Sequence, residues 1–276
     1  MTADRWTLAV VRQLGLGRLL PLGHRGDGAW ITEEAARTVL RRAADGVPGV
    51  RVGALRVSLA DPGRTYEPAV PPPPGALPPG PLRVTGEFAA SADPSAPGGE
   101  PLPAVAARLR SALGTAATER LGLMVTEVDL RVTALLDTGT PAPVSGPGPS
   151  GGSDPADGSE PADGWNQADG LTPAGGPDPV AGPGAVDEPV SSEAARVAAA
   201  VLSVPGVDRL AGALGRPVHF AEVRATDLAL PRRHVRVEVA VSAAERAADV
   251  ARAVRVAVAE TVPDVPSVTV LVTAVR

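Results

Sequence analysis

The chain of 276 residues contains no cysteine and no lysine. Without cysteine it can form no disulfide, no thiolate metal site and no cysteine nucleophile, and a cytoplasmic protein is the expectation. All 26 basic residues are arginine. Aromatic side chains make up only 2% of the sequence, so a folded core must be built mainly from valine, leucine and alanine.

Long apolar runs are also missing. No stretch reaches the roughly 18 consecutive apolar residues of a transmembrane helix, so we expect no transmembrane segment and any membrane role to be peripheral. Residues 1–23 have no basic start, no adequate apolar centre and no small-residue cleavage site. We therefore expect no secretory signal.

The spacings of the common catalytic and metal-binding motifs are absent as well. His24, His219 and His234 stand in unrelated contexts, with no His-x-x-x-His, Glu-x-x-His or Gly-x-Ser-x-Gly around them. The segment GLGRLLPLG (15–23) has Leu20 where a dinucleotide loop needs its third glycine, and it lacks the lysine of a P-loop. We predict no catalytic residue, no cofactor and no metal. The better interpretation of this segment is apolar docking on the first domain through Leu16, Leu19, Leu20 and Leu22.

Glycine and proline are abundant, with 31 residues of each. Residues 138–190 carry eight acidic side chains, no arginine and no periodic apolar pattern. Such a segment cannot bury enough surface to offset its chain entropy, so we predict a disordered acidic linker with an r.m.s. span on the order of 40 Å. The net charge of −5 therefore resides in the linker, and the flanking parts are nearly neutral.

The two flanking parts resemble each other. The tetrapeptide VPGV occurs at 47–50 and 204–207, and it follows EAAR at 34–37 and 193–196. Near the end of each part, VTEVDLRVTAL (125–135) aligns with VPSVTVLVTAV (265–275). Because several blocks recur in the same order, we predict a tandem repeat.

Each repeat predicts the order α-β-β-α-β, a two-layer α+β domain with its helices on one sheet face. Thr32 and Ser192 can cap the first helix, which Pro-Gly ends. Alternating residues then predict two strands, with Arg236 and Glu238 facing outward in the second repeat.

A second helix is expected over about 103–121 and 243–262, where Ser242 and Glu245 have capping-box spacing. A final strand follows. The apolar stripe of the first helix consists of Ile31, Ala35, Val39, Ala43 and Val47.

The expected organisation is an N-terminal segment (1–27), a first domain (28–137) with a proline-rich insertion (61–81), the linker (138–190) and a second domain (191–276). Each domain has a modest core, so the two domains either pack together or pack with a second chain. The sequence leaves this choice open.

GAWITEEAARTVLRRAADGVPGVRVGALRVSLAD (28–61) and ERLGLMVTEVDLRVTALLD (119–137) resemble the opening and the close of the alkaline shock protein family of bacterial stress proteins. The similarity covers about 28–137 and, more loosely, 190–276. It implies an abundant cytoplasmic protein without enzymatic activity, which acts in envelope homeostasis near the inner membrane, often through a membrane-anchored relative. It implies no catalytic residues. The arginine-only, alanine-rich composition is typical of a GC-rich bacterial genome.

Several short features have both a plain and a functional interpretation. Arg232, Arg233 and His234 are expected at a hairpin turn, as a solvated basic patch or as an anion or headgroup contact. Arg25-Gly26-Asp27 is best interpreted as a polar turn. The insertion PPPPGALPPGP (71–81) is either a tolerated extension or a polyproline ligand for an aromatic groove. Trp165 is either a chance aromatic or a recognition motif.

The leading hypothesis is a non-catalytic cytoplasmic scaffold or stress protein that acts by protein–protein contacts at the inner membrane face, with self-association as a further expectation. One alternative is a nucleic-acid-binding α+β module, which the near-neutral domains disfavour. The other is an enzyme or an accessory subunit of a larger complex, with a site formed only between the repeats.

Overall fold

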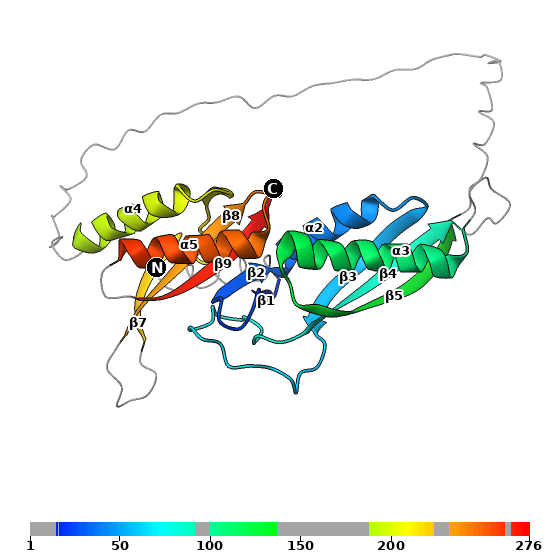
Figure 1. Ribbon diagram of the computed structural model, residues 1–276, viewed down its shortest axis with the longest axis horizontal. Coiled ribbons are helices and arrows are strands. Elements are labelled where there is room, and N and C mark those ends of the chain that lie inside the picture. Colours follow the sequence, from blue (N-terminus) through cyan, green and yellow to red (C-terminus); the bar gives the residue numbers. More distant parts are fainter. Residues whose placement is uncertain (1–14, 16, 92–99, 137–187, 224–231, 263–265) are drawn as a thin grey trace, which may run out of the picture. The chain divides into compact units, whose positions relative to one another are not determined.

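The computed structural model describes residues 15, 17–91, 100–136, 188–223, 232–262 and 266–276 (Figure 1). These residues form a mixed α+β structure of helices packed on β-sheets, as the sequence predicts. Most of the predicted linker, including Trp165, lies outside the described residues. The parts before and after it belong to one compact unit, so the two predicted domains pack together.

The first half builds a three-stranded sheet in the order β3-β4-β5. β3 pairs with β4 antiparallel, and β4 pairs with β5 parallel across the intervening helix. The helix over 102–121 is confirmed, and its last turn is a π-helix. The elements are α2 (Glu33–Asp45), β3 (Val50–Leu59), β4 (Leu82–Ser91), α3 (Leu102–Thr115), η1 (Ala116–Leu121) and β5 (Val125–Leu136).

The second half has the same order of elements, with one strand split in two. Both pieces pair antiparallel with β8, and β8 pairs parallel with β9. The split falls where β3 has a bulge between Val52 and Leu55, so a short irregularity in one half is a loop over 211–217 in the other. The elements are α4 (Glu188–Leu202), β6 (Val207–Leu210), β7 (Val218–Val223), β8 (Arg232–Val241), α5 (Ala247–Thr261) and β9 (Ser267–Val275).

The N-terminal hairpin joins the sheet of the second half. β1 (Leu19–Leu22) pairs antiparallel with β2 (Ala29–Thr32), and β2 pairs parallel with β9. The sheet therefore runs β1-β2-β9-β8-β6, with β7 beside β8. Leu19, Leu20 and Leu22 are buried and dock on the first domain as predicted, because β1 pairs with residues 29–32 and the Leu77 N–H donates to the Leu19 carbonyl (2.8 Å). The same hairpin also joins a sheet that contains residues 207–275. Leu16 lies outside the described residues.

Thr32 links the hairpin, the first helix and the second half through one buried hydroxyl. Its Oγ1 accepts a hydrogen bond from the Ala35 backbone N–H (3.2 Å), which caps α2 as predicted. The same hydroxyl donates to the carbonyl of Thr273 in β9 (3.2 Å). Because Thr32 closes β2 and opens α2, Ile31 lies in the strand instead of the helical stripe.

The other predicted caps are wrong. Ser192 lies inside α4, because the helix begins at Glu188, within the predicted linker. α5 begins only at Ala247, so Ser242 and Glu245 make no capping box. The Ser242 hydroxyl instead accepts from the Ala244 N–H (3.2 Å) in a turn that precedes the helix.

One face of each sheet packs on its helices, and valine dominates the second core (Figure 1). Val235, Val237 and Val239 of β8 are fully buried, as their alternation predicts. The expectation that Glu238 faces solvent is wrong, because its exposure is 0%. The 211–217 loop covers it, and the Leu214 N–H donates to Glu238 Oε2 (3.0 Å).

The proline-rich insertion covers the other face of the shared sheet, on the side away from the helices (Figure 1). Trp30 of β2 is 1% exposed and donates from Nε1 to the carbonyl of Leu77 (3.2 Å). The Thr269 hydroxyl of β9 donates to the carbonyl of Pro71 (2.9 Å). The insertion thus packs on an aromatic residue of its own chain. A second, smaller core on this face contains Leu19, Trp30, Val70 and Leu271.

Two glycines permit the close approach of the halves. Gly28 has φ +58°, and a Cβ there would lie 2.8 Å from Val70 Cγ2 and 3.0 Å from the Val268 carbonyl oxygen. Gly122 has φ +86°, and a Cβ there would lie 2.4 Å from the Cβ of Ala248 in α5. A side chain at either position would separate the halves.

Trp30→Ala is expected to lower the free energy of unfolding by about 3–5 kcal/mol, because it opens a cavity where the hairpin, the insertion and β9 meet. Chemical denaturation of the full chain measures this change. The control is Tyr66→Ala in the same insertion, since Tyr66 is 46% exposed and its loss should cost far less. Equal effects of both substitutions would contradict the structure.

Candidate anion-binding site

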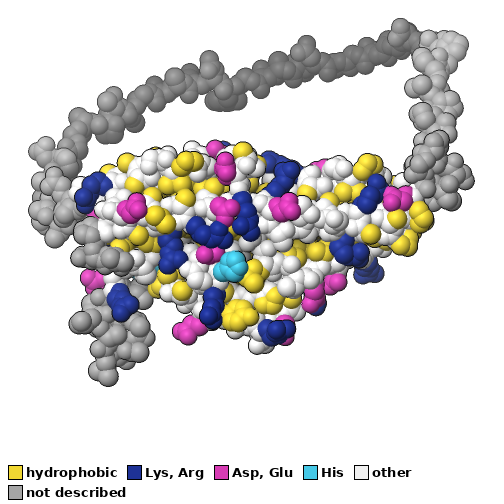
Figure 2. All heavy atoms as spheres, in the orientation of Figure 1, with side chains coloured by type: hydrophobic (Ala, Val, Ile, Leu, Met, Phe, Trp, Pro, Cys, Tyr) yellow, Lys and Arg dark blue, Asp and Glu magenta, His cyan; other side chains and the backbone are white. Residues whose placement is uncertain are grey.

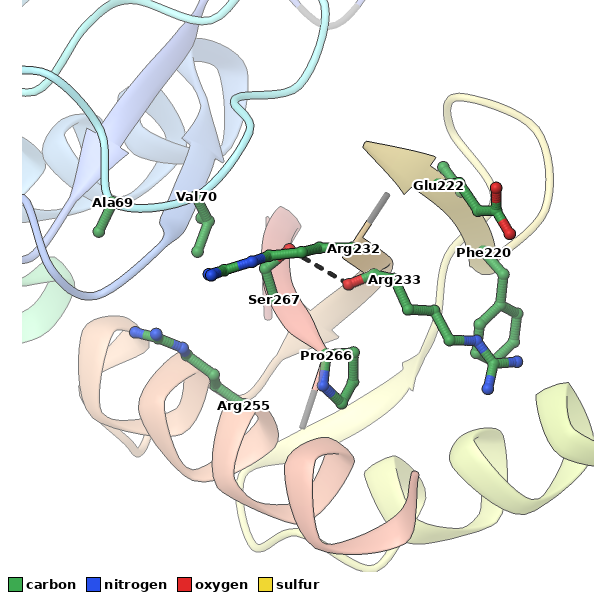
Figure 3. Close-up of a pocket in the computed structure, with 10 residues that line it drawn as sticks. Ala69, Val70, Phe220, Glu222, Arg232, Arg233, Arg255, Pro266 and Ser267 are labelled. Atoms are coloured by element: carbon green, nitrogen blue, oxygen red, sulfur yellow. Dashed lines mark hydrogen bonds between the residues drawn. The ribbon is translucent and has the colours of Figure 1, made fainter. Parts of the chain in front are cut away.

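The structure contains a cavity of about 870 Å³ at the end of the shared sheet where β7, β8 and β9 meet (Figure 3). Strands β7 and β8 supply one side, and the start of β9 and α5 supply another. Residues 69–70 of the proline-rich insertion close a third side. The lining residues are Ala69, Val70, Phe220, Ala221, Glu222, Arg232, Arg233, Arg255, Pro266 and Ser267.

Two guanidinium groups point into this cavity. Figure 3 shows the side chains of Arg232 and Arg255 directed toward the same space beside Val70. Arg232 is exposed, and among the described residues no hydrogen bond or salt bridge holds its guanidinium. Arg255 donates through Nη1 to the carbonyl of Gly26, in the turn between β1 and β2. That bond orients Arg255 toward the cavity.

Arg233 also lines the cavity, but it has other partners. Residues 232 and 233 lie on opposite faces of β8, because side chains alternate along a strand. Arg233 forms a salt bridge with the buried carboxylate of Glu193 in α4. Its guanidinium also lies 4.9 Å from the ring centroid of Phe220 in β7, within the range of a cation–π contact. We assign Arg233 a role in fixing the wall of the cavity.

His234 is buried, with 6% exposure, and does not line the cavity. A solvated patch of three residues is therefore wrong for this histidine. Its Nδ1 lies 2.8 Å from the Ser267 hydroxyl of β9. Burial lowers the pKa of His234, and the positive charge of Arg236 lowers it further, while the hydrogen bond with Ser267 opposes these effects. The ring is thus neutral near pH 7 and adds no positive charge to the site.

The other sequence features lie elsewhere. Arg25-Gly26-Asp27 is a polar turn, as expected: Asp27 accepts from the His24 backbone N–H (2.7 Å) and lies 3.2 Å from Arg252 Nε. His219 lies in β7, where burial and then the charges of Arg236 and Arg216 lower its pKa.

Sequence reasoning missed Arg255. It lies in α5 next to the buried Val254, at a position where the sequence pattern indicates the polar border of an amphipathic helix. Only the sheet order and the Gly26 contact place it opposite Arg232. No local sequence signal could identify it.

The chemistry of this arrangement favours a compact anion. A guanidinium group offers a planar fork of N–H donors that matches the oxygens of a carboxylate or phosphate. The walls beside the arginines include apolar groups from Val70, Phe220 and Pro266, which exclude part of the surrounding water. Figure 3 shows the carboxylate of Glu222 directed away from the two guanidinium groups, which leaves them free to face an anion.

Two further findings concern the described residues alone. None of their helices is long and apolar enough to cross a membrane. No group of three or more histidine and acidic side chains in the described ranges could hold a metal ion.

Lowering the pH from about 7 to about 5 is expected to destabilise the fold through His234. The neutral ring is preferred in the folded state, so this contribution is present above the ordinary histidine pKa near 6.5 and is lost as the pH falls through the folded-state value. His234→Asn should therefore flatten the dependence of unfolding free energy on pH. The buried Glu238, whose pKa burial raises, acts in the opposite sense and is common to both proteins. Parallel pH curves for wild type and variant would contradict the prediction.

No family model, no curated protein and no solved structure matches this chain. The resemblance to the alkaline shock protein family therefore remains an interpretation of residue patterns.

Proposed function

We propose that the chain is a non-catalytic scaffold, built from two divergent copies of an alkaline-shock-like unit, that binds an acidic segment of a partner protein at the Arg232–Arg255 cavity. The site of action is the cytoplasmic side of the inner membrane, in envelope homeostasis. The observation that carries the binding proposal is the convergence of two guanidinium groups from separate elements on one cavity.

The order of elements supports descent from one unit. Both halves run helix, strand, strand, helix, strand, and in both the final strand pairs parallel with the strand before the second helix. The irregularity of the first strand also falls at the same place in both halves, between Val52 and Leu55 and between β6 and β7. The two halves therefore agree in the order and pairing of their elements as well as in the shared VPGV and EAAR sequences.

The nature of the cavity supports binding instead of catalysis. Arginine stays protonated at every physiological pH, so Arg232 and Arg255 can attract and orient an anion but cannot exchange a proton with it. An acidic protein segment fits the site because it offers carboxylates together with apolar stems that can contact Val70 and Pro266. On the face shown in Figure 2, acidic and basic side chains are interleaved, in contrast to the single-sign surface typical of a nucleic-acid binder.

Arg232→Glu/Arg255→Glu is expected to weaken the binding of a glutamate-rich peptide about tenfold or more, because two attractive contacts become repulsive. Titration of the full chain by calorimetry measures this loss. The matched control is Arg51→Glu/Arg209→Glu, which makes the same change in net charge at two exposed positions of β3 and β6.

The control distinguishes a site from general charge attraction. Equal weakening in both double variants would contradict the cavity as the binding site. The wild type and the two double variants are also mixed with vesicles that contain an anionic lipid. Binding to vesicles alone, lost only in the cavity variant, would replace the protein partner with a lipid phosphate.

A further inference from the structure

The β5 strand lies at the edge of its sheet. It pairs with β4 on one side, and no strand in the described part of the chain pairs with its other side. The corresponding strand of the second half, β9, has β8 on one side and β2 on the other. The first half therefore presents an edge at the position where the second half is completed by a strand.

The backbone of β5 presents hydrogen-bonding groups at this edge. Arg110 of α3 donates through Nε to the carbonyl of Val128 (3.1 Å), so that carbonyl points away from β4. Leu130 and Val132 follow at intervals of two and direct their backbone groups to the same side. In β9 the matching groups are used, because the Val270 N–H donates to the carbonyl of Gly28 beside β2 (3.0 Å).

Among the described residues, the flexible side chain of Arg110 protects the β5 edge. Arg110 is exposed, and the residue that matches it in α5 is the fully buried Ala251. A charged side chain over an edge strand is a common device against unwanted pairing, but an exposed arginine can move aside at little cost. The opposite edge of this sheet is held more firmly, since Glu33 and Arg41 of α2 bind backbone groups of Val57 and Gly53.

The side chains at the β5 edge include exposed apolar groups. Val132 is 40% exposed although it stands opposite the buried Phe88, and Leu135 is 59% exposed. On the face away from the helices, Asp129 and Arg131 are both exposed. Arg83 Nε lies 3.4 Å from Asp129 Oδ2 and steadies that carboxylate.

We propose that β5 pairs antiparallel with β5 of a second copy of this chain, with Leu130 opposite Leu130 on the two-fold axis. This register places Asp129 of each copy opposite Arg131 of the other. Both pairs fall at positions where the two strands exchange no hydrogen bonds and side chains lie closest. Val128 then stands opposite Val132 of the second copy, and the exposed apolar surface of Val132 is covered.

Charge selects this register. A shift that places residue 129 on the axis sets Asp129 against Asp129. A shift that places residue 131 there sets Arg131 against Arg131. Like charges directly opposite each other destabilise a strand pair, whereas opposite charges stabilise it. The proposed register alone among these three has two attractive pairs and no repulsive one, so the β5 sequence is complementary to itself.

The test is analytical ultracentrifugation of the full chain with reversed charges. Asp129→Arg alone and Arg131→Asp alone should each raise the dimer dissociation constant about tenfold or more, because two attractive pairs become repulsive. The double variant Asp129→Arg/Arg131→Asp should restore dimerisation, and a mixture of the two single variants should form a heterodimer. Arg110→Ala should strengthen the dimer. The control is Arg56→Asp in β3, which is exposed on the same face.

Wild type that sediments as a monomer up to about 0.1 mM, where weak complexes form, would overturn the proposal. A dimer that both single variants leave unchanged would also overturn it, as would a double variant that stays monomeric while its circular dichroism matches wild type. The peptide-binding site is far along the chain from β5, so these outcomes are independent of the proposed partner.

Discussion

The parallel pairing of β2 with β9 is the contact on which the rest of this structure depends. It requires a residue without a side chain at position 28, because a Cβ there would meet the Val268 carbonyl oxygen at 3.0 Å. It brings the Thr32 hydroxyl to Thr273, and it places the Gly26 carbonyl where Arg255 can donate to it. The arginine cavity therefore exists only because the two halves are joined, since its lining comes from both.

The two halves differ in what lies beside their last strand, which is β5 in the first half and β9 in the second. In the second half, Ala251 is small enough for β2 to approach, and a strand satisfies the backbone of β9. In the first half, Arg110 occupies the matching position, and its side chain satisfies one carbonyl of β5. A small side chain at this helix position thus accompanies an edge that accepts a strand, and a charged side chain accompanies an edge that it covers.

Local periodicity predicted the elements whose signals are local. The stripe through Ala35 and Val39 gave the first helix, and the alternation through Val235 and Val239 gave β8. The same alternation predicted correctly which face of β8 carries Glu238, but it did not predict that Glu238 is buried. A loop of seven residues covers that face, and no periodic pattern encodes where a loop will lie. The LLPL and AWIT segments gave no strand signal of their own. LLPL pairs with AWIT, and AWIT pairs in turn with β9, which is more than 230 residues away along the chain. The role of Arg255 could not be predicted for the same reason, because Arg255 lies opposite Arg232 only in the folded structure.

The distribution of charge on β8 explains why the cavity depends on so few residues. His234, Arg236 and Glu238 alternate along the face that carries the loop, and burial shifts the histidine toward its neutral form. Arg236 Nε lies 3.5 Å from Glu238 Oε1, so its charge is balanced by the carboxylate to the extent that Glu238 is ionised. Burial opposes that ionisation, while Arg236 and the Leu214 N–H favour it.

The charge of Arg233 is balanced by the carboxylate of Glu193. Of the arginines on β8, only Arg232 is left with uncompensated charge at the cavity, and Arg255 supplies the second from across the sheet. An anion at this cavity would therefore experience two local positive charges instead of a diffuse basic surface, which is the condition for a contact that depends on geometry more than on net charge.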